Sequence, residues 1–580
     1  MADLCIDFGS TFVKFFVCEE KRIIFKDKLP FPSPLVNDGV SYEVGIEDID
    51  GVILRIFDTA MPYSPKRCFI SVQMHGFIIR DENREFSNYI SWKDKRGNVE
   101  SPYIDGIDFQ LCGTSLKRNL PAVKLLGKEF AKGCELFTLG SYISYKLTER
   151  NETHKTDGCA TGFFNAQTLH PLEIKNLTLP TVRHSVCAVG SYRGVRIYTP
   201  VGDHQASYLG CGAEEEAYLL NIGTATQLST VCECANISNK KLEARPYFNE
   251  KRLLTITNLT GGEALFASNS TDALLRDVAQ AIEELPYRRK MTVGGGGAAQ
   301  AYCDVKKFCE LHGIECVLAE DEIGSAGLMK LCELTQTKIG TMLSEIPFSN
   351  IPVIFKNCGL DFLIVDTEHG AFDYTPLSSL ITTARLVGLT AIVRLSDGER
   401  RDITRLADMG ADGFILPMTN SAEDIQKVVE YAKYAPIGNR GISTNRAHTF
   451  YNPPPMATYM RAANKRIKVF AQIETKSGVE NIDGILSTEG VDGVFVGPND
   501  LSISLGCVGC DEPIKQAIST VADSAKRHGK PWGIITTSST LIAHSLSCDT
   551  SFISYGSEIN MIKDSCNSIR RKIYVRENND

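Results

Sequence analysis

The chain has 580 residues and a formal net charge of −8 at pH 7. This length exceeds what one hydrophobic core supports, so we expect two to four domains of ordinary globular composition. The mild acidic excess argues against non-specific nucleic-acid binding, and no apolar run reaches the about 18 residues that a membrane span needs.

The N-terminal sequence and the cysteines indicate the compartment. MADLCIDFGS lacks the basic residues and the apolar stretch of a secretory signal peptide. The nineteen cysteines are scattered, as expected of free thiols in a reducing compartment. Cys507 and Cys510 form a C-x-x-C pair without a second pair, so we do not predict a zinc site there. These features favour a cytoplasmic protein that contacts neither membranes nor nucleic acids.

Two similar strand–turn–strand patterns occur in the first 330 residues. LCIDFGSTFVKFFVCEEKRIIF begins at Leu4, and YLLNIGTATQLSTVCEC begins at Tyr218. Each has an apolar strand, an Asp or Asn, a turn of Gly followed by Ser or Thr, and a second strand. This weak internal repeat predicts two related halves, at about 1–215 and 216–332.

The turns in these patterns suit phosphate binding. Backbone N–H groups approach phosphate oxygens closely at a glycine, because it has no Cβ. Asp7 precedes the first turn and is placed to hold Mg²⁺ directly or through water. A third glycine turn, TVGGGGAAQ at 292–300, is a poor dinucleotide fingerprint, and no G-x-x-x-x-G-K-[ST] motif occurs. We therefore predict neither a Rossmann nor a P-loop site.

An ordered set of motifs in this part resembles the FGGY carbohydrate kinases. The motifs are IDFGSTFVK (6–14), QMHGFII (73–79), ISWKDKR (90–96), KTDGCATGFFNAQT (155–168), PVGDHQASYLGCG (200–212), LNIGTATQ (220–227) and VGGGGAAQ (293–300). Each motif alone is weak, whereas their order is specific. The resemblance implies an α/β module with a duplicated, actin-like (ribonuclease H-like) ATPase fold.

The resemblance also implies roles for the matched positions. Asp203 would be the catalytic base that takes the proton of the sugar hydroxyl. The residues that would bind ATP with Mg²⁺ are Asp7, Gly9, Ser10 and Thr11 in the first phosphate loop, Gly223 and Thr224 in the second, and Gly295, Gly296 and Ala298 at the adenosine. The residues that would face the sugar are Gln73, Met74, His75, Trp92 and Asp94.

From about residue 337 onward, eight short apolar strands alternate with stretches able to form helices. The strands are TKIGTML, DFLIVD, TAIVRL, GFILPM, KVFAQIE, GVFVGP, PWGIIT and SFISYG. Eight βα units in succession are typical of a (β/α)8, or TIM, barrel, which we assign to 333–580. The long connection APIGNRGISTNRAHTFYNPPP (435–455) is rich in Gly, Asn and Pro, and we expect a loop at the barrel mouth.

Polar residues follow the C-terminal ends of these strands, which converge at one mouth of a barrel. They are Asp366 and His369 after the second strand, Arg394 in the third, Gln472 and Glu474 in the fifth, and Asn499 and Asp500 after the sixth. Two carboxylates with open positions suit Mg²⁺ or Mn²⁺ and a chelating 2-oxo acid. His369, held by Asp366, would move a proton, and Arg394 would add positive charge. This set predicts a retro-aldol cleavage that releases pyruvate.

A lysine at the C-terminal end of a strand, which a Schiff-base aldolase would need, is not found; Lys468 begins its strand. The module instead resembles the HpcH/HpaI family of metal-dependent 2-oxo acid aldolases. The matching stretches are DFLIVDTEHG, AIVRLSD, LADMGADGFILPM, GNRGIS, VFAQIETKSGVENIDGIL and GVDGVFVGPNDLSISLG.

That resemblance implies metal ligands at Glu474 and Asp500 and an acid/base pair of His369 with Asp366. It implies substrate contacts from Arg394, Gln472 and the backbone of Asn499. It places Asp408 near proton transfer across a subunit interface, in a homo-oligomer that assembles as a trimer of dimers. We expect His448 at the surface, and Arg440 and Arg446 solvated by default.

Three hypotheses follow. In the first, the chain is bifunctional: it phosphorylates a sugar or sugar acid with ATP, and it cleaves a 4-hydroxy-2-oxo acid, of the 2-keto-3-deoxy sugar acid type, to pyruvate and an aldehyde. In the second, only the aldolase is catalytic. The kinase-like module, trimmed between 230 and 290 relative to most of its family, is then a nucleotide or sugar sensor. In the third, that module is only a scaffold.

Overall fold

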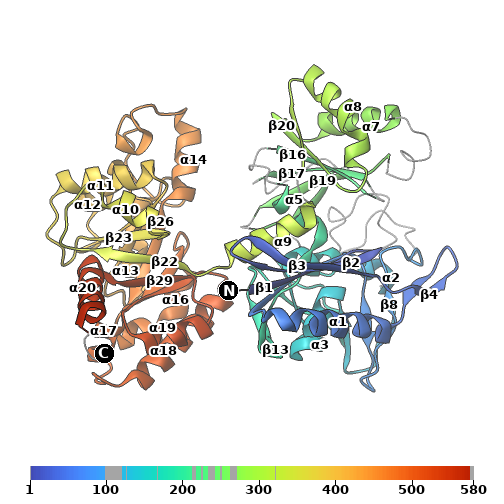
Figure 1. Ribbon diagram of the computed structural model, residues 1–580, viewed down its shortest axis with the longest axis horizontal. Helices are drawn as coiled ribbons and strands as arrows, with labels where there is room; N and C mark the ends of the chain where they lie inside the picture. The colour runs from blue at the N-terminus through green and yellow to red at the C-terminus, as the bar shows by residue number, and fades with distance from the viewer. Residues whose placement is uncertain are drawn as a thin grey trace. The chain divides into compact units, whose positions relative to one another are not determined.

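The computed structural model describes residues 2–97, 120–125, 127–165, 168–211, 217–223, 226–232, 242–248, 251–260, 271–319 and 322–574. The chain divides into two compact units, Met1–Thr335 and Gln336–Asp580 (Figure 1). Each unit is described by itself.

The first sheet of unit 1 has strands in the order β13-β14-β6-β1-β2-β3, and β15 also pairs with β6. The bounds are β1 (Ala2–Phe8), β2 (Phe12–Glu19), β3 (Arg22–Pro30), β6 (Arg67–Val72), β13 (Ala188–Tyr192), β14 (Val195–Tyr198) and β15 (Val201–Gly202). Alternation along β1 places Leu4, Ile6 and Phe8 against helices α1 (Ile46–Ala60) and α3 (Leu139–Thr148). Cys5 lies on the opposite face, against α5 (Asp203–Gly210) and α9 (Ile323–Leu334).

The second sheet of unit 1 has the order β18-β19-β17-β16-β20-β21. Its strands are β16 (Ala217–Ile222), β17 (Thr226–Cys232), β18 (Glu243–Pro246), β19 (Arg252–Leu259), β20 (Lys290–Gly294) and β21 (Glu315–Leu318). The helices α7 (Asp272–Glu284) and α8 (Ala298–Leu311) supply apolar side chains to its core.

The two sheets repeat one topology. In each, a first strand pairs antiparallel with the next strand, which pairs antiparallel with a third, and the first strand also pairs parallel with a later one. The predicted duplicated, actin-like α/β fold is therefore confirmed. Smaller elements complete the unit: β4 (Pro34–Asn37), β5 (Tyr42–Val44), β7 (Ile78–Arg80), β8 (Tyr89–Ile90), β9 (Cys134–Phe137), β10 (Glu152–His154), β11 (Leu177–Thr178), β12 (Thr181–Arg183), α2 (Pro121–Leu125) and α4 (Lys155–Gly158).

Helices α5 and α9 cross in backbone contact because a glycine on each helix faces the other. A Cβ on Gly327 would lie 1.9 Å from the carbonyl oxygen of Ala206, and one on Gly210 would lie 2.0 Å from the carbonyl oxygen of Ile323. Only residues without a side chain allow this approach. The crossing fixes α5, whose first residue is Asp203.

We expect Gly327→Ala to destabilise unit 1 by about 3 kcal/mol, because two backbones, rather than flexible side chains, have to separate. Differential scanning calorimetry should show a lower transition temperature for one of the two units. Gly51→Ala is the matched control: Gly51 lies inside α1, and its Cβ would meet nothing within 4 Å. That control should be neutral or slightly stabilising, and an equal loss in both variants would contradict the prediction.

Unit 2 is a closed barrel of the parallel strands β22 to β29 in sequence order. The strands are β22 (Lys338–Leu343), β23 (Phe362–Asp366), β24 (Thr390–Arg394), β25 (Gly413–Leu416), β26 (Lys468–Ile473), β27 (Gly493–Val496), β28 (Trp532–Ile535) and β29 (Phe552–Ser557). The helices are α10 (Ile351–Asn357), α11 (Tyr374–Leu386), α12 (Arg400–Met409), α13 (Ala422–Ala432), α14 (Met456–Arg466), α15 (Lys476–Glu480), α16 (Ile482–Ser487), α17 (Pro498–Ser504), α18 (Asp511–Arg527), α19 (Ser539–Ser547) and α20 (Glu558–Tyr574). The predicted (β/α)8 barrel is confirmed.

Apolar side chains fill the barrel, so it is a packed core rather than a channel. Inside it, Phe495 stacks on Phe552, and Phe362 and Phe470 pack edge to face against these rings. A larger apolar layer lies between the strands and the surrounding helices. The polar ends of the strands are thereby left at the mouth.

The long segment 435–455 corrects one expectation. It follows α13 and leads through α14 into β26, so it lies at the N-terminal end of the strands, opposite the mouth. Lys433, just before it, bonds to the carbonyl of Ile467 and contacts Asp492 at 3.1 Å, and both partners precede a strand. Gly, Asn and Pro content identified a loop but not the side of the barrel.

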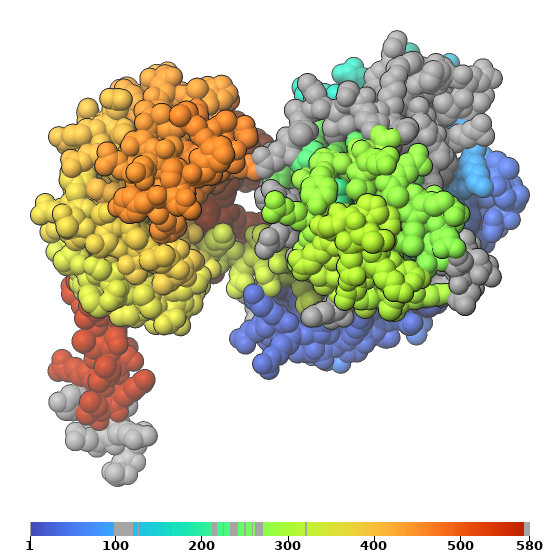
Figure 2. All heavy atoms as spheres, turned by 90° about the horizontal axis from the view of Figure 1, so that it is seen from above, coloured from blue at the N-terminus to red at the C-terminus, as the bar shows by residue number. Residues whose placement is uncertain are grey.

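Within the described residues, no helix combines the length and the apolar character needed to cross a membrane. The last helix, α20, projects from the body of its own unit (Figure 2, red).

Candidate active sites

In unit 1, Asp7 and Asp203 lie close enough to interact electrostatically. The hydroxyl of Ser71, on the neighbouring strand β6, donates to Oδ1 of Asp7 at 2.7 Å. Burial raises the pKa of Asp203 to about 7, and the charge of Asp7 adds to that effect. The N–H of His204 donates to Oδ1 of Asp203 at 2.8 Å and opposes it. Two carboxylates that repel each other are a suitable donor set for Mg²⁺.

The first predicted phosphate loop is a tight turn after Asp7. The N–H of Gly9 donates to the carbonyl of Asp7 at 3.1 Å, and a Cβ on Gly9 would lie 3.0 Å from the carbonyl of Phe12. Ser10 is half-buried and Thr11 is exposed. The loop is thus open to a ligand at the end of β1.

The second loop and the adenosine loop meet at the end of β16. Gly295 has a φ of +93°, and a Cβ there would lie 2.6 Å from the carbonyl of Ile222. Gly223 follows Ile222 directly, whereas Thr224 is outside the described residues. Gly296 has open space around its Cα, and Ala298 begins α8. The structure therefore brings these predicted nucleotide residues together.

The predicted sugar-facing residues separate into two groups. Gln73, Met74 and His75 are buried directly after β6, and neither Nε2 of Gln73 nor Nε2 of His75 has a hydrogen-bond partner among the described residues. His75 has a φ of +65°, and burial with the charge of Arg245 lowers its pKa to about 3, so the ring is neutral. Unpartnered buried polar atoms of this kind suit the hydroxyls of a sugar.

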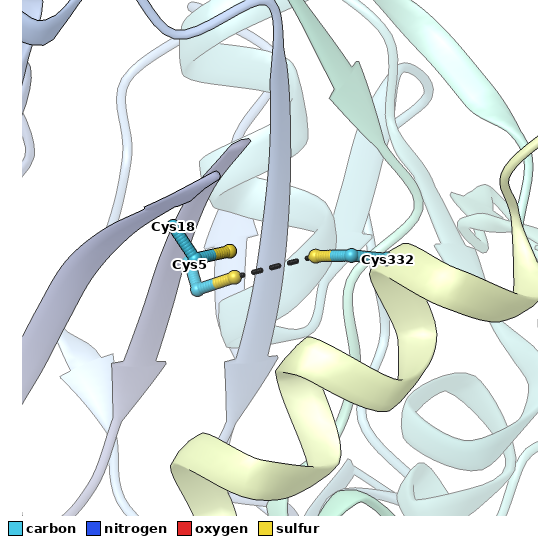
Figure 3. Close-up of side chains that lie close together, drawn as sticks. All are labelled: Cys5, Cys18 and Cys332. Atoms are coloured by element: carbon cyan, nitrogen blue, oxygen red, sulfur yellow. Dashed lines mark hydrogen bonds between the residues drawn. The ribbon is translucent and has the colours of Figure 1, made fainter. Parts of the chain in front are cut away.

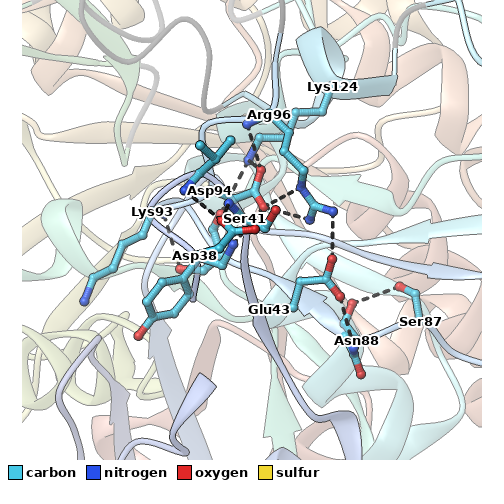
Figure 4. A network of polar contacts seen from close by, with 12 residues as sticks. Asp38, Ser41, Glu43, Ser87, Asn88, Lys93, Asp94, Arg96 and Lys124 are labelled. Atoms are coloured by element: carbon cyan, nitrogen blue, oxygen red, sulfur yellow. Dashed lines mark hydrogen bonds and ion pairs between the residues drawn. The ribbon is translucent and has the colours of Figure 1, made fainter. Parts of the chain in front are cut away.

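Asp94 is instead held by partners within its own unit (Figure 4). Its fully buried carboxylate accepts from Nε of Arg96 at 2.8 Å and from the N–H of Tyr42 at 3.0 Å, and it contacts Nζ of Lys124 at 3.3 Å. These contacts make Asp94 an anchor for the segment that carries the half-buried Trp92. Contact of Asp94 and Trp92 with the sugar stays a prediction.

Three further charged residues surround the unit 1 site and were missed from the sequence. Asp157 accepts from Thr138 and Thr153, and burial raises its pKa to about 6. Arg245 is buried and pairs with Glu243. Its charge also acts on Asp203, His75 and His204. Lys14 pairs with Glu322. Asp157 lies in the motif KTDGCATG, so the sequence could have identified it as a site residue. No motif contains Arg245.

At the barrel mouth, Arg394 is fixed by two acids. Its Nε and Nη2 donate to Asp366 at 2.9 and 2.7 Å, and its Nη1 contacts Glu368 at 3.1 Å. Asp366 is therefore the partner of Arg394 rather than of the His369 imidazole, which corrects the predicted acid/base pair. The His369 side chain is 73% exposed and lies 3.8 Å from Glu368. Glu368 was missed, although it stands in the motif DTEHG.

Glu474 is buried at the same mouth with both oxygens engaged. Nε2 of Gln472 donates to Oε1 at 2.8 Å, and the N–H of Met418 donates to Oε2 at 2.9 Å. Burial raises the pKa of Glu474 to about 7, and Asp500 adds to the effect. A Cβ on Gly497 would lie 2.4 Å from Oε1 of Glu474, so a side chain there would displace this carboxylate.

The donor set at the mouth fits a hard divalent cation. Asp500 and Asn499 are exposed in the first turn of α17, facing solvent rather than the core. Oε1 of Gln472 is buried and has no hydrogen-bond partner within the part of the chain that the structure describes, which leaves an acceptor for a ligand. Interacting carboxylates and an orphaned amide oxygen are groups that such a cation and its substrate satisfy.

Asp408, His448 and Arg440 lie away from this mouth. Asp408 is near the C-terminal end of α12, where Nη2 of Arg440 donates to it at 2.6 Å and Nδ1 of His448 bonds to its carbonyl at 3.0 Å. His448 and Arg440 are both buried, which corrects the surface and solvated expectations; Arg446 is exposed. Within one chain, Asp408 does not join the predicted catalytic set.

A closed parallel barrel with buried Glu, Arg and Gln at the C-terminal ends of its strands defines a TIM-barrel enzyme. Residues 350–561 match the model of the HpcH/HpaI aldolase/citrate lyase family. A 5-keto-4-deoxy-D-glucarate aldolase of Klebsiella pneumoniae is 34% identical over 207 residues, which are 35% of this chain and 80% of that protein. Through its second unit, the chain belongs to the HpcH/HpaI aldolase/citrate lyase family.

Solved structures resemble each part of the chain. An HpcH/HpaI aldolase from Desulfitobacterium hafniense DCB-2 is 30% identical, with a TM-score of 0.40, and covers 42% of this chain and 96% of its own. A ligand-bound xylulose kinase from Lactobacillus acidophilus is 16% identical, with a TM-score of 0.47, and covers 57% of this chain and 89% of its own.

Proposed function

We propose that the chain is a bifunctional enzyme. Unit 2 cleaves a 4-hydroxy-2-oxo acid to pyruvate and an aldehyde, with Mg²⁺ or Mn²⁺. Unit 1 phosphorylates a sugar or sugar acid with ATP and Mg²⁺. The observation that carries the first activity is the buried Glu474 beside Gln472 and Arg394 at the mouth of a family barrel. The curated relative is named for a keto-deoxy sugar acid, and we propose a substrate of that class.

In the cleavage, Glu474 and Asp500 would hold the metal, which supplies Lewis acidity to the 2-oxo group. Arg394 is held rigid by Asp366 and Glu368, so its guanidinium meets the charge that develops on the 2-oxo oxygen without reorganising. His369 is exposed at the same mouth and would take the proton of the 4-hydroxyl. Oε1 of Gln472 offers an acceptor to the substrate.

In the phosphorylation, Asp203 would take the proton of the attacking hydroxyl. Its raised pKa, about 7, gives it the basicity that proton transfer near neutral pH needs. Gln73 and His75 would position the sugar, and the loops at Gly9, Gly223 and Gly295 would hold the nucleotide. Asp7 would hold Mg²⁺, which neutralises phosphate charge.

The experiment that tests the proposal measures pyruvate release from a panel of 4-hydroxy-2-oxo acids and 2-oxo-3-deoxy sugar acids. Reactions contain Mn²⁺ or Mg²⁺, with or without ATP, beside a chelated control. Metal-dependent pyruvate supports the aldolase. Pyruvate that rises only with ATP places phosphorylation before cleavage on the same molecule. Release that is unaffected by chelation would overturn the metal-dependent mechanism.

We also propose that the protein is a homo-oligomer that assembles through unit 2 and works in the cytoplasm. Ile562, Ile569 and Ile573 are exposed on α20 at spacings of seven and four, so they form one apolar stripe on the projecting helix. A second copy of the barrel would cover such a stripe. Cys68, Cys303, Cys358 and Cys566 are among the described cysteines that are free thiols, in keeping with a reducing compartment.

We expect the wild-type protein to exceed the 63.8 kDa of one chain in multi-angle light scattering. The combined variant Ile562→Ser, Ile569→Ser and Ile573→Ser should lower that mass, because it removes the apolar stripe. Lys563→Ser on the same helix is the control and should leave the mass unchanged. A monomeric wild-type protein would rule out the oligomer.

A further inference from the structure

Three buried cysteines from distant parts of the sequence converge in unit 1 (Figure 3). Cys5 is on β1, Cys18 on β2 and Cys332 on α9, and their sulfur atoms all lie within 4.8 Å of one another. The sulfurs of Cys5 and Cys332 are 3.5 Å apart. Neither the kinase motifs nor the aldolase site uses this cluster.

The strand register explains why the three thiols meet. Cys5 pairs directly with Phe16, and Phe16 and Cys18 are two residues apart, so Cys5 and Cys18 share one face of the sheet. That face packs against α9, which brings Cys332 over them. All three side chains belong to the same apolar cluster and are closed off from solvent.

We propose that Cys5, Cys18 and Cys332 form a three-thiolate site for a soft d¹⁰ metal ion, Cu⁺ or Zn²⁺. Thiolates select these ions over Mg²⁺ or Mn²⁺. A metal–sulfur distance of about 2.3 Å in a trigonal site separates the sulfurs by about 4 Å. That separation lies within the observed spacing, so small rotamer changes suffice.

The surroundings of the cluster favour three ligands. Asp3 is the nearby carboxylate, but Nε and Nη2 of Arg67 bind it at 2.8 and 2.6 Å. The described residues supply no fourth Cys, His or acid to the group. Nη2 of Arg67 also donates to the carbonyl of Cys332 at 3.2 Å, so a positive charge lies beside the thiols. Such a charge favours the thiolate form of a nearby cysteine.

Buried cysteines often act only as small apolar side chains. Cys68, on the adjacent strand β6, is of that kind: it pairs with Leu4 and lies in the apolar cluster on the other face of the sheet. Three sulfurs within the reach of one ion are a different arrangement. They link the first hairpin of the unit to its last helix.

The site would also fix the elements around Asp7, a consequence that rests on the proposed kinase function. Asp7 is two residues after Cys5 on β1, and a Cβ on Gly324, in the first turn of α9, would lie 3.2 Å from its carboxylate. A metal ion that joins β1 to α9 thus holds both sides of this position. We expect metal loading to raise the unfolding temperature of unit 1.

The test uses the reduced full-length protein, titrated with Cu⁺ or with Zn²⁺ against a competing chelator, with excess Mg²⁺ to occupy the barrel site. We expect one equivalent of one of these ions to be retained. Cys5→Ala, Cys18→Ala and Cys332→Ala should each weaken retention by about 100-fold or more, because a ligand is lost. Cys68→Ala is the matched control and should bind as the wild type does.

X-ray absorption on the loaded wild-type protein tests the site without any variant. Three sulfur neighbours that disappear in Cys332→Ala support the proposal. Two sulfurs, oxygen or nitrogen neighbours only, or equal retention by all variants would overturn it. A Cys5–Cys332 disulfide in the protein as purified, with no bound metal, would overturn it too. Because the readout is the metal environment, failure of the kinase proposal does not affect this outcome.

Discussion

Glu474→Gln is expected to lower metal-dependent pyruvate release by about 1,000-fold or more, because the metal contributes several kcal/mol to stabilising the developing charge. Glu474 is 3% exposed, so its carboxylate is buried at the mouth. A carboxamide cannot supply the negative charge that Asp500 and Glu474 together offer a divalent cation. The measurement is kcat/KM for pyruvate release at saturating Mn²⁺.

The structure indicates that this variant will fold. Both oxygens of Glu474 accept hydrogen bonds, so one of the two partners would face the new NH₂ group. Gln472 can turn its amide, because its own Oε1 has no partner among the described residues, and can then accept from the new group. The variant should therefore retain the unfolding temperature of the wild type when both are measured with a chelator.

Glu480→Gln is the matched control, because Glu480 is an exposed residue on α15, shortly after the same strand. It should retain full activity and full Mn²⁺ affinity in calorimetry. The proposed metal site would be wrong if Glu474→Gln kept wild-type activity. It would also be wrong if the chelator did not lower pyruvate release by the wild type. The unfolding temperature shows whether the variant is folded. Loss of activity in an unfolded variant would not support the proposed metal site.

The sequence predicted the barrel and its mouth well, because strand order fixes where strand ends meet. Glu474 and Gln472 are two residues apart at the end of one strand, so their closeness could be predicted from their spacing in the sequence alone. The pairing of Asp366 was not predicted. Register places Asp366 beside Arg394 on the adjacent strand, and a guanidinium is a stronger partner for a carboxylate than a neutral imidazole.

Other differences between the sequence-based predictions and the structure also arise from contacts between residues that are distant in the sequence. His448 and Arg440 stand in a loop-like sequence, yet the carbonyl of His448 accepts from Arg385 on α11, and both side chains reach Asp408 on α12. The cysteine cluster joins residues 327 positions apart, which no local pattern reveals. A motif identified Asp94, but its partners could not be predicted, because Tyr42 and Lys124 come from other segments.

Asp203→Asn is expected to lower ATP-dependent phosphorylation by about 100- to 10,000-fold, the range that a general base contributes. The measurement is ADP formation with a panel of sugars and sugar acids. The N–H of His204 still finds the Oδ1 acceptor in the variant, so α5 should begin as before. Binding of ATP should persist, because the nucleotide loops are unchanged. Pyruvate release by unit 2 should also be unchanged and serves as the internal control.

The same substitution should stabilise unit 1 at high pH, and the sign follows from the pKa. Burial raises the pKa of Asp203 from 3.8 to about 7, so the folded state holds a proton that the unfolded state releases. Stability is therefore lost as pH rises from about 4 to about 7 and stays low above that. From pH 5 to pH 8 the loss is about 2–3 kcal/mol, and Asn removes it.

ADP formation, ATP binding and the unfolding temperatures at pH 5 and pH 8 together distinguish the three hypotheses for unit 1. For a kinase, Asp203→Asn should lose ADP formation and should gain stability over the wild type more at pH 8 than at pH 5. For a sensor, wild type and variant should bind ATP alike, and neither should turn it over. For a scaffold, ATP should not bind at all. A variant that gains no stability at pH 8 would show that Asp203 is not held in the buried, charge-repelling position from which its role as a base is inferred.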